Sequence, residues 1–138
     1  MQEERSLEFR KERFSYIAHF YRCPVSKNDF TTTKLDTLNL QQVYDQYRQK
    51  YNIPSPEEMK ATRTRYGLSA AKMSLILGLG TNQYRLYENG EMPSLAVGRY
   101  IRLLEDPATF RRLLNCAKGQ FTETEYQKLL NKLSRISA

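Results

Sequence analysis

Four residues in one short stretch of this sequence have side chains suited to contact with the edges of base pairs, and a fifth is suited to contact with a phosphate. Asn82 and Gln83 carry amides, which can make bidentate hydrogen bonds to N6 and N7 of adenine in the major groove of DNA. Thr81 adds a hydroxyl group, and Leu86 could contact a thymine methyl group. Arg85 can reach a backbone phosphate. These residue types predict that the stretch reads base pairs.

Two residues nearer the N-terminus are suited to phosphate contacts. Ser69 stands at the expected start of a helix, where exposed backbone N–H groups favour an anion. Lys72 follows one turn later. Together with Arg85 they would orient the protein on a duplex, because phosphate contacts set position and not sequence preference.

Three short helices, the first beginning at Pro56 and the last ending before Pro93, would position these side chains. Ser55 can cap the first helix, with Pro56 at its first position, and Gly67 would end it after Tyr66. Ser69 can cap the second. The turn Gly78-Leu79-Gly80 would lead into a third helix over roughly residues 81–88. The side chains expected to pack inward are Met73, Ile76, Leu77, Tyr84 and Tyr87.

Further helices are expected on the C-terminal side. One begins near Ser94, and another begins at Asp106-Pro107. Thr122 and Glu125 can form a capping box for the last helix. Its apolar stripe, which could cover its own core or form a dimer surface, is Tyr126, Leu129, Leu130 and Leu133.

The N-terminal third reads differently, as a small antiparallel β element followed by one helix. Leu7–Cys23 alternates apolar residues at period two, which predicts a long strand or one bent near Arg10–Arg13, and Phe30–Thr33 reads as a returning strand. Asn39 can cap the helix that follows. Its expected apolar face consists of Leu40, Val43, Tyr44, Tyr47 and Tyr51.

Two closely spaced prolines then predict a domain boundary. Asn52-Ile53-Pro54-Ser55-Pro56 breaks the helical pattern. We therefore expect one domain over residues 1–52 and a second over residues 53–138.

The segment Met59–Leu104 resembles the phage-repressor (XRE-type) helix-turn-helix domain. The matching residues are Arg63, Gly67-Leu68-Ser69, Leu79-Gly80, Tyr87-Glu88-Asn89-Gly90 and Pro93. This resemblance implies a structural ion pair between Arg63 and Glu88. The implied fold is mainly α: a five-helix phage-repressor-like domain preceded by a small antiparallel β-sheet and a connecting helix.

Over its whole length the chain resembles the YgiT/MqsA-type antitoxin-like proteins, which join a zinc-ribbon-like sheet to such a domain through a helix. The residues that fit are Phe30-Thr31-Thr32-Thr33, the Leu40–Tyr47 helix and Gly80-Thr81-Asn82. The resemblance implies that Asn82 reads a base. A second base reader of that type, an arginine, falls on Leu86, and Ala70 replaces a common glutamine that contacts the backbone.

The zinc site of that type of protein is not expected in this chain. Zinc needs four nitrogen or sulfur ligands, usually from two Cys-x-x-Cys pairs. Here Cys23 is followed by Ser26 at the second ligand position, no pair precedes it, and His19 is the only histidine. We predict no metal and no cofactor, with His19 as a half-buried strand residue. A longer natural chain with the remaining ligands is the alternative.

Composition limits the function classes. The chain has 138 residues, 40% of them apolar, and a net charge of +7 that is spread along its length and suits an anionic partner. No apolar run approaches the ~18 residues of a membrane helix, and no signal peptide is recognised. Cys23 and Cys116 show no disulfide spacing. We expect a cytoplasmic protein with no membrane partner.

The sequence therefore predicts a sequence-specific regulator of double-stranded DNA, acting as a homodimer and as antitoxin and autorepressor of a toxin–antitoxin operon. No nucleophile with a base, phosphate-binding glycine loop or carboxylate pair points to an enzyme. One alternative is a protein-interaction module that binds a toxin or another partner with the helix-turn-helix as scaffold. The other is a phage or mobile-element repressor without a toxin.

Overall fold

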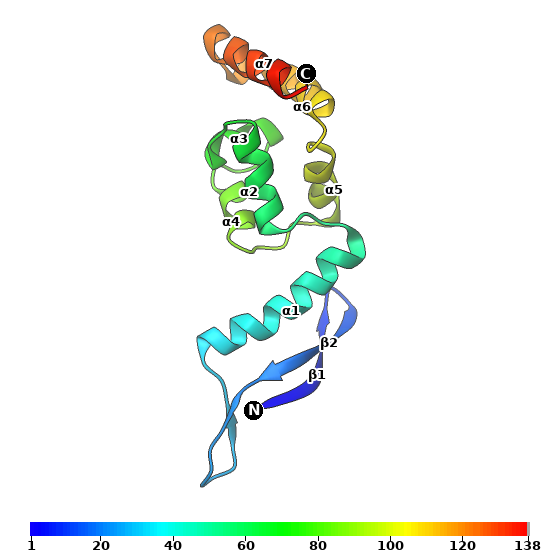
Figure 1. Ribbon diagram of the computed structural model, residues 1–138, viewed down its shortest axis with the longest axis vertical. Helices are drawn as coiled ribbons and strands as arrows, with labels where there is room; N and C mark the ends of the chain where they lie inside the picture. Colours follow the sequence, from blue (N-terminus) through cyan, green and yellow to red (C-terminus); the bar gives the residue numbers. More distant parts are fainter. Residues whose placement is uncertain (138) are drawn as a thin grey trace. The chain divides into compact units, whose positions relative to one another are not determined.

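The computed structural model describes residues 1–137, which form two compact units. The first unit is Met1–Tyr51, and the second begins at Asn52. The described residues are mainly helical, with antiparallel strands only near the N-terminus, so the predicted mainly α class is confirmed (Figure 1). They contain two small two-stranded sheets.

The first sheet is a hairpin of β1 (Gln2–Phe9) and β2 (Glu12–His19), paired in register from Phe9 opposite Glu12 to Gln2 opposite His19. The chain reverses at Arg10 and Lys11, whose φ angles are 51° and 67°. Two successive positive φ angles are what a two-residue type I′ turn requires. The prediction of one strand over Leu7–Cys23 is therefore wrong, and the bend near Arg10–Arg13 is a complete reversal.

The helix α1 (Thr33–Tyr51) covers the edge of β2 that β1 leaves open. The Asn39 amide accepts from the His19 N–H at 2.8 Å and donates to the His19 carbonyl at 3.0 Å, and Gln42 does the same with Ile17 at 2.9 and 2.8 Å. Gln46 donates to the Ser15 carbonyl at 2.6 Å. Side-chain amides thus replace a third strand and protect a sheet edge that could otherwise pair with another chain.

These contacts correct the expected start of α1. Asn39 lies inside the helix and does not cap it. The helix begins six residues earlier at Thr33, where the Leu35 N–H donates to Thr32 Oγ1 at 3.2 Å. Leu40 is 39% exposed instead of packing inward. The buried apolar residues of this unit are Phe14, Ala18, Phe20, Val43 and Tyr47.

Residues 20–32 extend from the hairpin as a second small sheet. Its strands are β3 (Tyr21–Arg22) and β4 (Asp29–Phe30). Tyr21 pairs with Phe30, and their rings stack with centroids 5.4 Å apart. The returning strand is therefore shorter than the predicted Phe30–Thr33.

The second unit is helical throughout its described residues. The helix α4 contacts both α2 and α3, and α6 contacts α3 and α7. The elements are α2 (Pro56–Arg65), α3 (Ala70–Leu77), α4 (Gln83–Glu88), α5 (Leu95–Leu103), α6 (Pro107–Cys116), the 3₁₀ turn η1 (Lys118–Gln120) and α7 (Glu123–Ser137).

Side-chain caps explain where most of these helices begin. Ser55 and Glu58 form the predicted capping box of α2, with Pro56 at its first position. Ser69 caps α3 by accepting from the Lys72 N–H at 3.1 Å. The remaining caps are Ser94 for α5, Asp106 for α6 and the Thr122–Glu125 box for α7.

The core of this unit is built around two buried aromatic side chains. The Tyr66 ring stacks on Phe110 with centroids 4.0 Å apart, and its hydroxyl donates to the Leu104 carbonyl at 2.6 Å. Ile53, from the proline-rich segment, is 2% exposed and lies against Gly98, where an added Cβ would sit 3.0 Å from its side chain. Residues of the predicted boundary segment therefore pack within the second unit.

Candidate nucleic-acid interface

The turn between α3 and α4 is fixed by a left-handed glycine and by one buried serine. Gly78 ends α3 with φ +79°, and the Leu79 N–H then donates to the Ser74 carbonyl at 2.8 Å. The Ser74 hydroxyl, which is fully buried, accepts from the Tyr84 N–H at 3.0 Å. The first turn of α4 is thereby bonded directly to α3.

Tyr84 and Tyr87 form the inner face of α4, as predicted. They are 0% and 7% exposed. The Tyr84 hydroxyl donates to the Met59 carbonyl of α2 at 2.6 Å. Burial raises the pKa of the Tyr84 phenol, with a smaller contribution from the Glu88 carboxylate, so the group stays a neutral donor above the pH at which an ordinary tyrosine ionises. Tyr84 therefore joins α4 to both α2 and α3.

An ion pair between Arg63 and Glu88 holds the C-terminal end of α4 against α2. Arg63 of α2 donates to both carboxylate oxygens of Glu88, at 2.8 and 2.9 Å, and to the Leu68 carbonyl at 3.0 Å. The side chains of Arg63 and Glu88 are 20% and 9% exposed. Hydrogen bonding to Glu88 raises the pKa of the Arg63 guanidinium. This is the bridge that the sequence resemblance implied.

The turn before α4 and the outer face of α4 together hold three of the four predicted base-contacting residues in exposed positions. Thr81, Asn82 and Arg85 are exposed, and Leu86 is 44% exposed. Asn82 stands at the N-cap of α4, but its side chain makes no capping bond. Instead, the side-chain amide oxygen of Asn82 accepts from the Arg85 guanidinium at 3.2 Å. The structure thus places an amide, a guanidinium and an apolar side chain on one solvent-facing surface.

Gln83 differs from its neighbours because its side chain already has a charged partner. Its amide donates to the Glu91 carboxylate at 2.7 Å, and it is only half-exposed. Glu91 follows α4 in the loop to α5, and sequence reasoning missed it. Its only signal was a carboxylate shortly after Gly90. Base contact by Gln83 would require the amide to leave this carboxylate.

The predicted phosphate contacts of α3 lie at its first turn. Ser69 is exposed at the N-cap. The Lys72 ammonium lies 3.1 Å from the Glu125 carboxylate of α7 and 4.9 Å from the centre of the Phe121 ring. Hydrogen bonding to Lys72 lowers the pKa of Glu125. Both side chains of this pair are more than one third exposed, so the pair is weak and can open to a competing anion.

Cys23 and Ser26 of the first unit lie within hydrogen-bonding distance of each other. Ser26 forms a hydrogen bond with the Cys23 side chain, which lowers the pKa of that thiol. His19 is half-buried at the end of β2, as predicted. Within residues 1–137, no three histidine, cysteine, aspartate or glutamate side chains gather as metal ligands would. Cys23 and Cys116 are both free thiols.

Comparison with protein-family models, with curated proteins and with solved structures found no match for this chain. Across the described residues, each helix is too short or too polar to cross a bilayer. Support for a function therefore comes from the residues and their geometry alone.

Proposed function

We propose that the unit from Asn52 onward is a phage-repressor-like helix-turn-helix domain that binds double-stranded DNA in a sequence-specific manner. The observation that carries the proposal is the two-sided character of α4. On one side Tyr84 is bonded to α2 and α3 and Tyr87 is buried, while Asn82, Arg85 and Leu86 are exposed on the other. A short, firmly held helix with polar outer residues is what major-groove reading requires.

In this proposal α4 enters the major groove and α3 contacts the backbone. The Asn82 amide would pair with the N6 and N7 edge of adenine, and Leu86 would meet a thymine methyl group. Arg85, Ser69 and Lys72 would contact phosphates and set the orientation of α4. Thr81 lies beside Asn82 at the same end of the helix, whereas Gln83 joins the contact only after leaving Glu91.

We further propose that the protein is a homodimeric transcriptional regulator, the antitoxin and autorepressor of a toxin–antitoxin operon. This proposal follows the sequence resemblance. A dimer would read two half-sites separated by about 34 Å, or a multiple, on one face of the duplex.

The test begins with selection of duplexes from a random pool, because selection works without a known operator sequence. Asn82→Ala and Arg85→Ala are then titrated against the selected duplex at fixed salt. Asn82→Ala should weaken binding by about 1–3 kcal/mol and relax the preference at one base pair. Arg85→Ala should weaken binding to all duplex sequences by a similar amount.

Arg99→Ala is the matched control for Arg85, since Arg99 is an exposed arginine on α5. All variants should unfold at the temperature of the wild type. If the pool yields no enriched sequence, the proposal of sequence-specific binding is wrong. If the two α4 variants bind like Arg99→Ala, the assignment of the reading face is wrong.

A second candidate function, binding of a protein partner, is favoured by one observation in the first unit. The stacked rings of Tyr21 and Phe30 are 50% and 53% exposed, and Val25 in the loop between them is 92% exposed. Exposed apolar side chains that gather at one tip are typical of interaction sites. A toxin or another protein that co-purifies with the wild type and is lost from Tyr21→Ser/Phe30→Ser would support this function.

Gene context separates the third candidate from the first. A repressor of a phage or mobile element would have no toxin-like reading frame beside it, whereas an antitoxin would be encoded next to one. Co-expression of the neighbouring frame with and without this protein would decide between them through growth arrest and its relief.

A further inference from the structure

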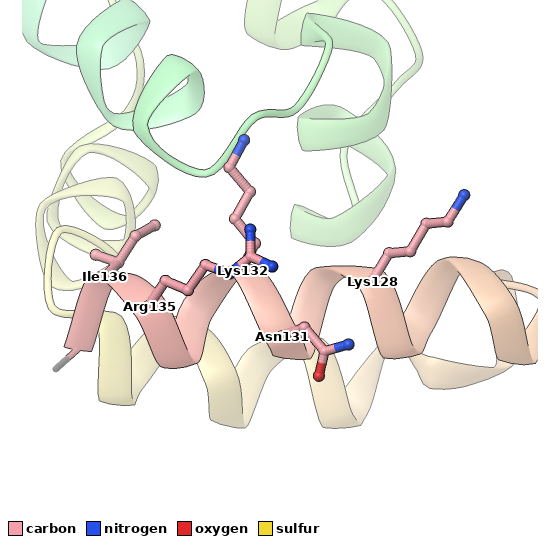
Figure 2. A pocket seen from close by; sticks show the side chains of 5 residues that line it. All are labelled: Lys128, Asn131, Lys132, Arg135 and Ile136. Carbon is pink, nitrogen blue, oxygen red and sulfur yellow. The ribbon is translucent and has the colours of Figure 1, made fainter.

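A cluster of cations lies along α7, away from the proposed reading face of α4. Lys128, Lys132 and Arg135 line a pocket of about 450 Å³ together with Asn131 and Ile136 (Figure 2). The spacing of four and three residues places the three cations on one side of the helix. The pocket is lined by three cations, one amide and one apolar side chain.

These three cations have no carboxylate partner among the ion pairs of the described residues. Among the described residues of the second unit, the ion pairs are Arg63–Glu88, Lys72–Glu125, Arg102–Glu58 and Arg102–Glu105. Like charges held close together repel each other, and an anion between them removes that repulsion. The unmatched positive charge of this side of α7 therefore favours an anionic ligand.

Two contacts place this side of α7 along the connection between α2 and α3. Lys72 of α3 pairs with Glu125 at 3.1 Å. Further along α7, the Lys132 side chain lies over Gly67, so closely that an added Cβ would stand 1.9 Å from its ammonium nitrogen. Figure 2 shows Lys132 extending from α7 toward this connection. The cation cluster thus lies near Ser69, where α3 begins.

We propose that Lys128, Lys132 and Arg135 form a second phosphate site, which holds the sugar–phosphate backbone of the duplex beside the contact made by α3. This inference rests on the proposed DNA-binding function. The site adds affinity and salt dependence but no sequence preference, because phosphates are the same at every base pair. Asn131 supplies an amide donor in the same pocket.

The test compares two triple variants that remove the same charge. The first is Lys128→Gln/Lys132→Gln/Arg135→Gln. The control, Lys60→Gln/Arg99→Gln/Arg112→Gln, neutralises exposed cations on α2, α5 and α6. Affinity for the selected duplex and for a random-sequence duplex is measured between 50 and 200 mM salt, and thermal unfolding checks that both variants are folded.

Each phosphate contact contributes about 0.9 to the slope of log K against log salt, so loss of three contacts should make the slope shallower by about 2.7. Over this salt range the wild type would then lose about 40-fold more affinity than the α7 variant. The control should keep the wild-type slope. Both variants should keep the wild-type ratio of selected to random duplex.

If the α7 variant and the control have equal slopes of log K against log salt, this inference is wrong, while the proposed role of α4 is unaffected. A wild type that binds no duplex would overturn both. Inorganic pyrophosphate separates the ligand sources. If it shifts the α7 amide resonances of the wild type while the duplex slope is unchanged in the α7 variant, the pocket takes a free anion and the proposal of a backbone site is wrong.

Discussion

Removal of the Arg63–Glu88 ion pair is the most direct test of how α4 is held in place. The informative substitutions are Arg63→Met and Glu88→Met, separately and together. Methionine keeps much of the side-chain volume but has neither charge nor hydrogen-bonding strength. The three variants form a double-mutant cycle that isolates the coupling between the two residues.

The size of the effect follows from what each substitution leaves behind. Arg63→Met leaves the Glu88 carboxylate, with 9% of its side chain exposed, without its partner, and also removes the donor to the Leu68 carbonyl. Breaking a buried pair costs about 3–5 kcal/mol, and the 20% exposure of Arg63 favours the lower end of that range. Glu88→Met should cost less, about 2 kcal/mol, because Arg63 keeps the Leu68 carbonyl and some contact with water.

The double variant should cost less than the sum of the two single variants, because neither charge is then stranded. We expect a coupling energy of about 1–3 kcal/mol from urea unfolding followed by circular dichroism. Hydrogen exchange of α2 and α4 amides would locate the loss. Lys72→Gln is the control, because its exposed pair with Glu125 should contribute less than about 1 kcal/mol. Additive single effects, or an Arg63→Met effect no larger than that of Lys72→Gln, would refute this reasoning.

Three further outcomes are expected. Tyr84→Phe should lower stability by about 1 kcal/mol near neutral pH. The variant should also lose less stability than the wild type as the pH rises above 10. A phenol whose folded pKa is raised above 10 stabilises the protein below that pH and loses this contribution as the pH rises. Glu91→Gln should strengthen DNA binding by removing a carboxylate beside Gln83. Hydrogen bonding to Arg102 lowers the pKa of Glu58 below its ordinary 4.5, so stability present above that pH should fall on acidification.

Each of these outcomes has its own measurement. Spectrophotometric titration of the tyrosines, with unfolding at pH 8 and above pH 10, tests the first, and an unchanged alkaline loss in the variant would contradict it. Duplex titration at fixed salt tests the second, where weaker binding would show that Glu91 orients Gln83 for contact. Unfolding of the wild type and of Glu58→Gln between pH 3 and 6 tests the third. That prediction fails if the free energy of unfolding falls with decreasing pH by the same amount in both proteins.

Helix starts in the second unit could be predicted because their signals are local. Ser55, Ser69, Ser94 and Thr122 each precede a helix whose first N–H groups need an acceptor, and the structure uses these residues as caps. The inward positions of α3 and α4 followed equally well from period 3.6. The start of α4 did not follow from this period. The predicted helix begins at about Thr81, but Thr81 and Asn82 form a turn and the helix begins at Gln83.

The first unit shows where local signals fail. The hairpin turn uses Arg10 and Lys11, neither of which is a usual residue at positive φ. Long-range contacts support it, since the Arg10 guanidinium donates to the Tyr47 hydroxyl at 3.3 Å and lies 5.2 Å from the ring centre. Asn39 was misread for a related reason. An asparagine in a helix is better explained as a cap until a β-strand edge is known to lie beside it.

The candidate site divides in the same way. Residue types and spacing predicted which α4 side chains face outward, but they could not show that Gln83 is bonded to Glu91 or Lys72 to Glu125. Glu91 is brought back by the turn that follows α4, and Glu125 is brought to Lys72 only by the tertiary fold. The cation site on α7 could not be predicted from the sequence either. Only the tertiary fold shows that Lys132 lies over Gly67, beside the connection between α2 and α3.

These contacts suggest how the proposed reading face is divided between rigid and adjustable parts. The inner side of α4 is fixed at Tyr84 by a 2.6 Å hydrogen bond and at Glu88 by two bonds from Arg63. The outer side makes weaker, solvent-exposed bonds, such as that between Asn82 and Arg85 at 3.2 Å. A duplex can replace the outer bonds at little cost while the helix position stays fixed. Substitutions inside should therefore alter stability and binding together, and substitutions outside should alter binding alone.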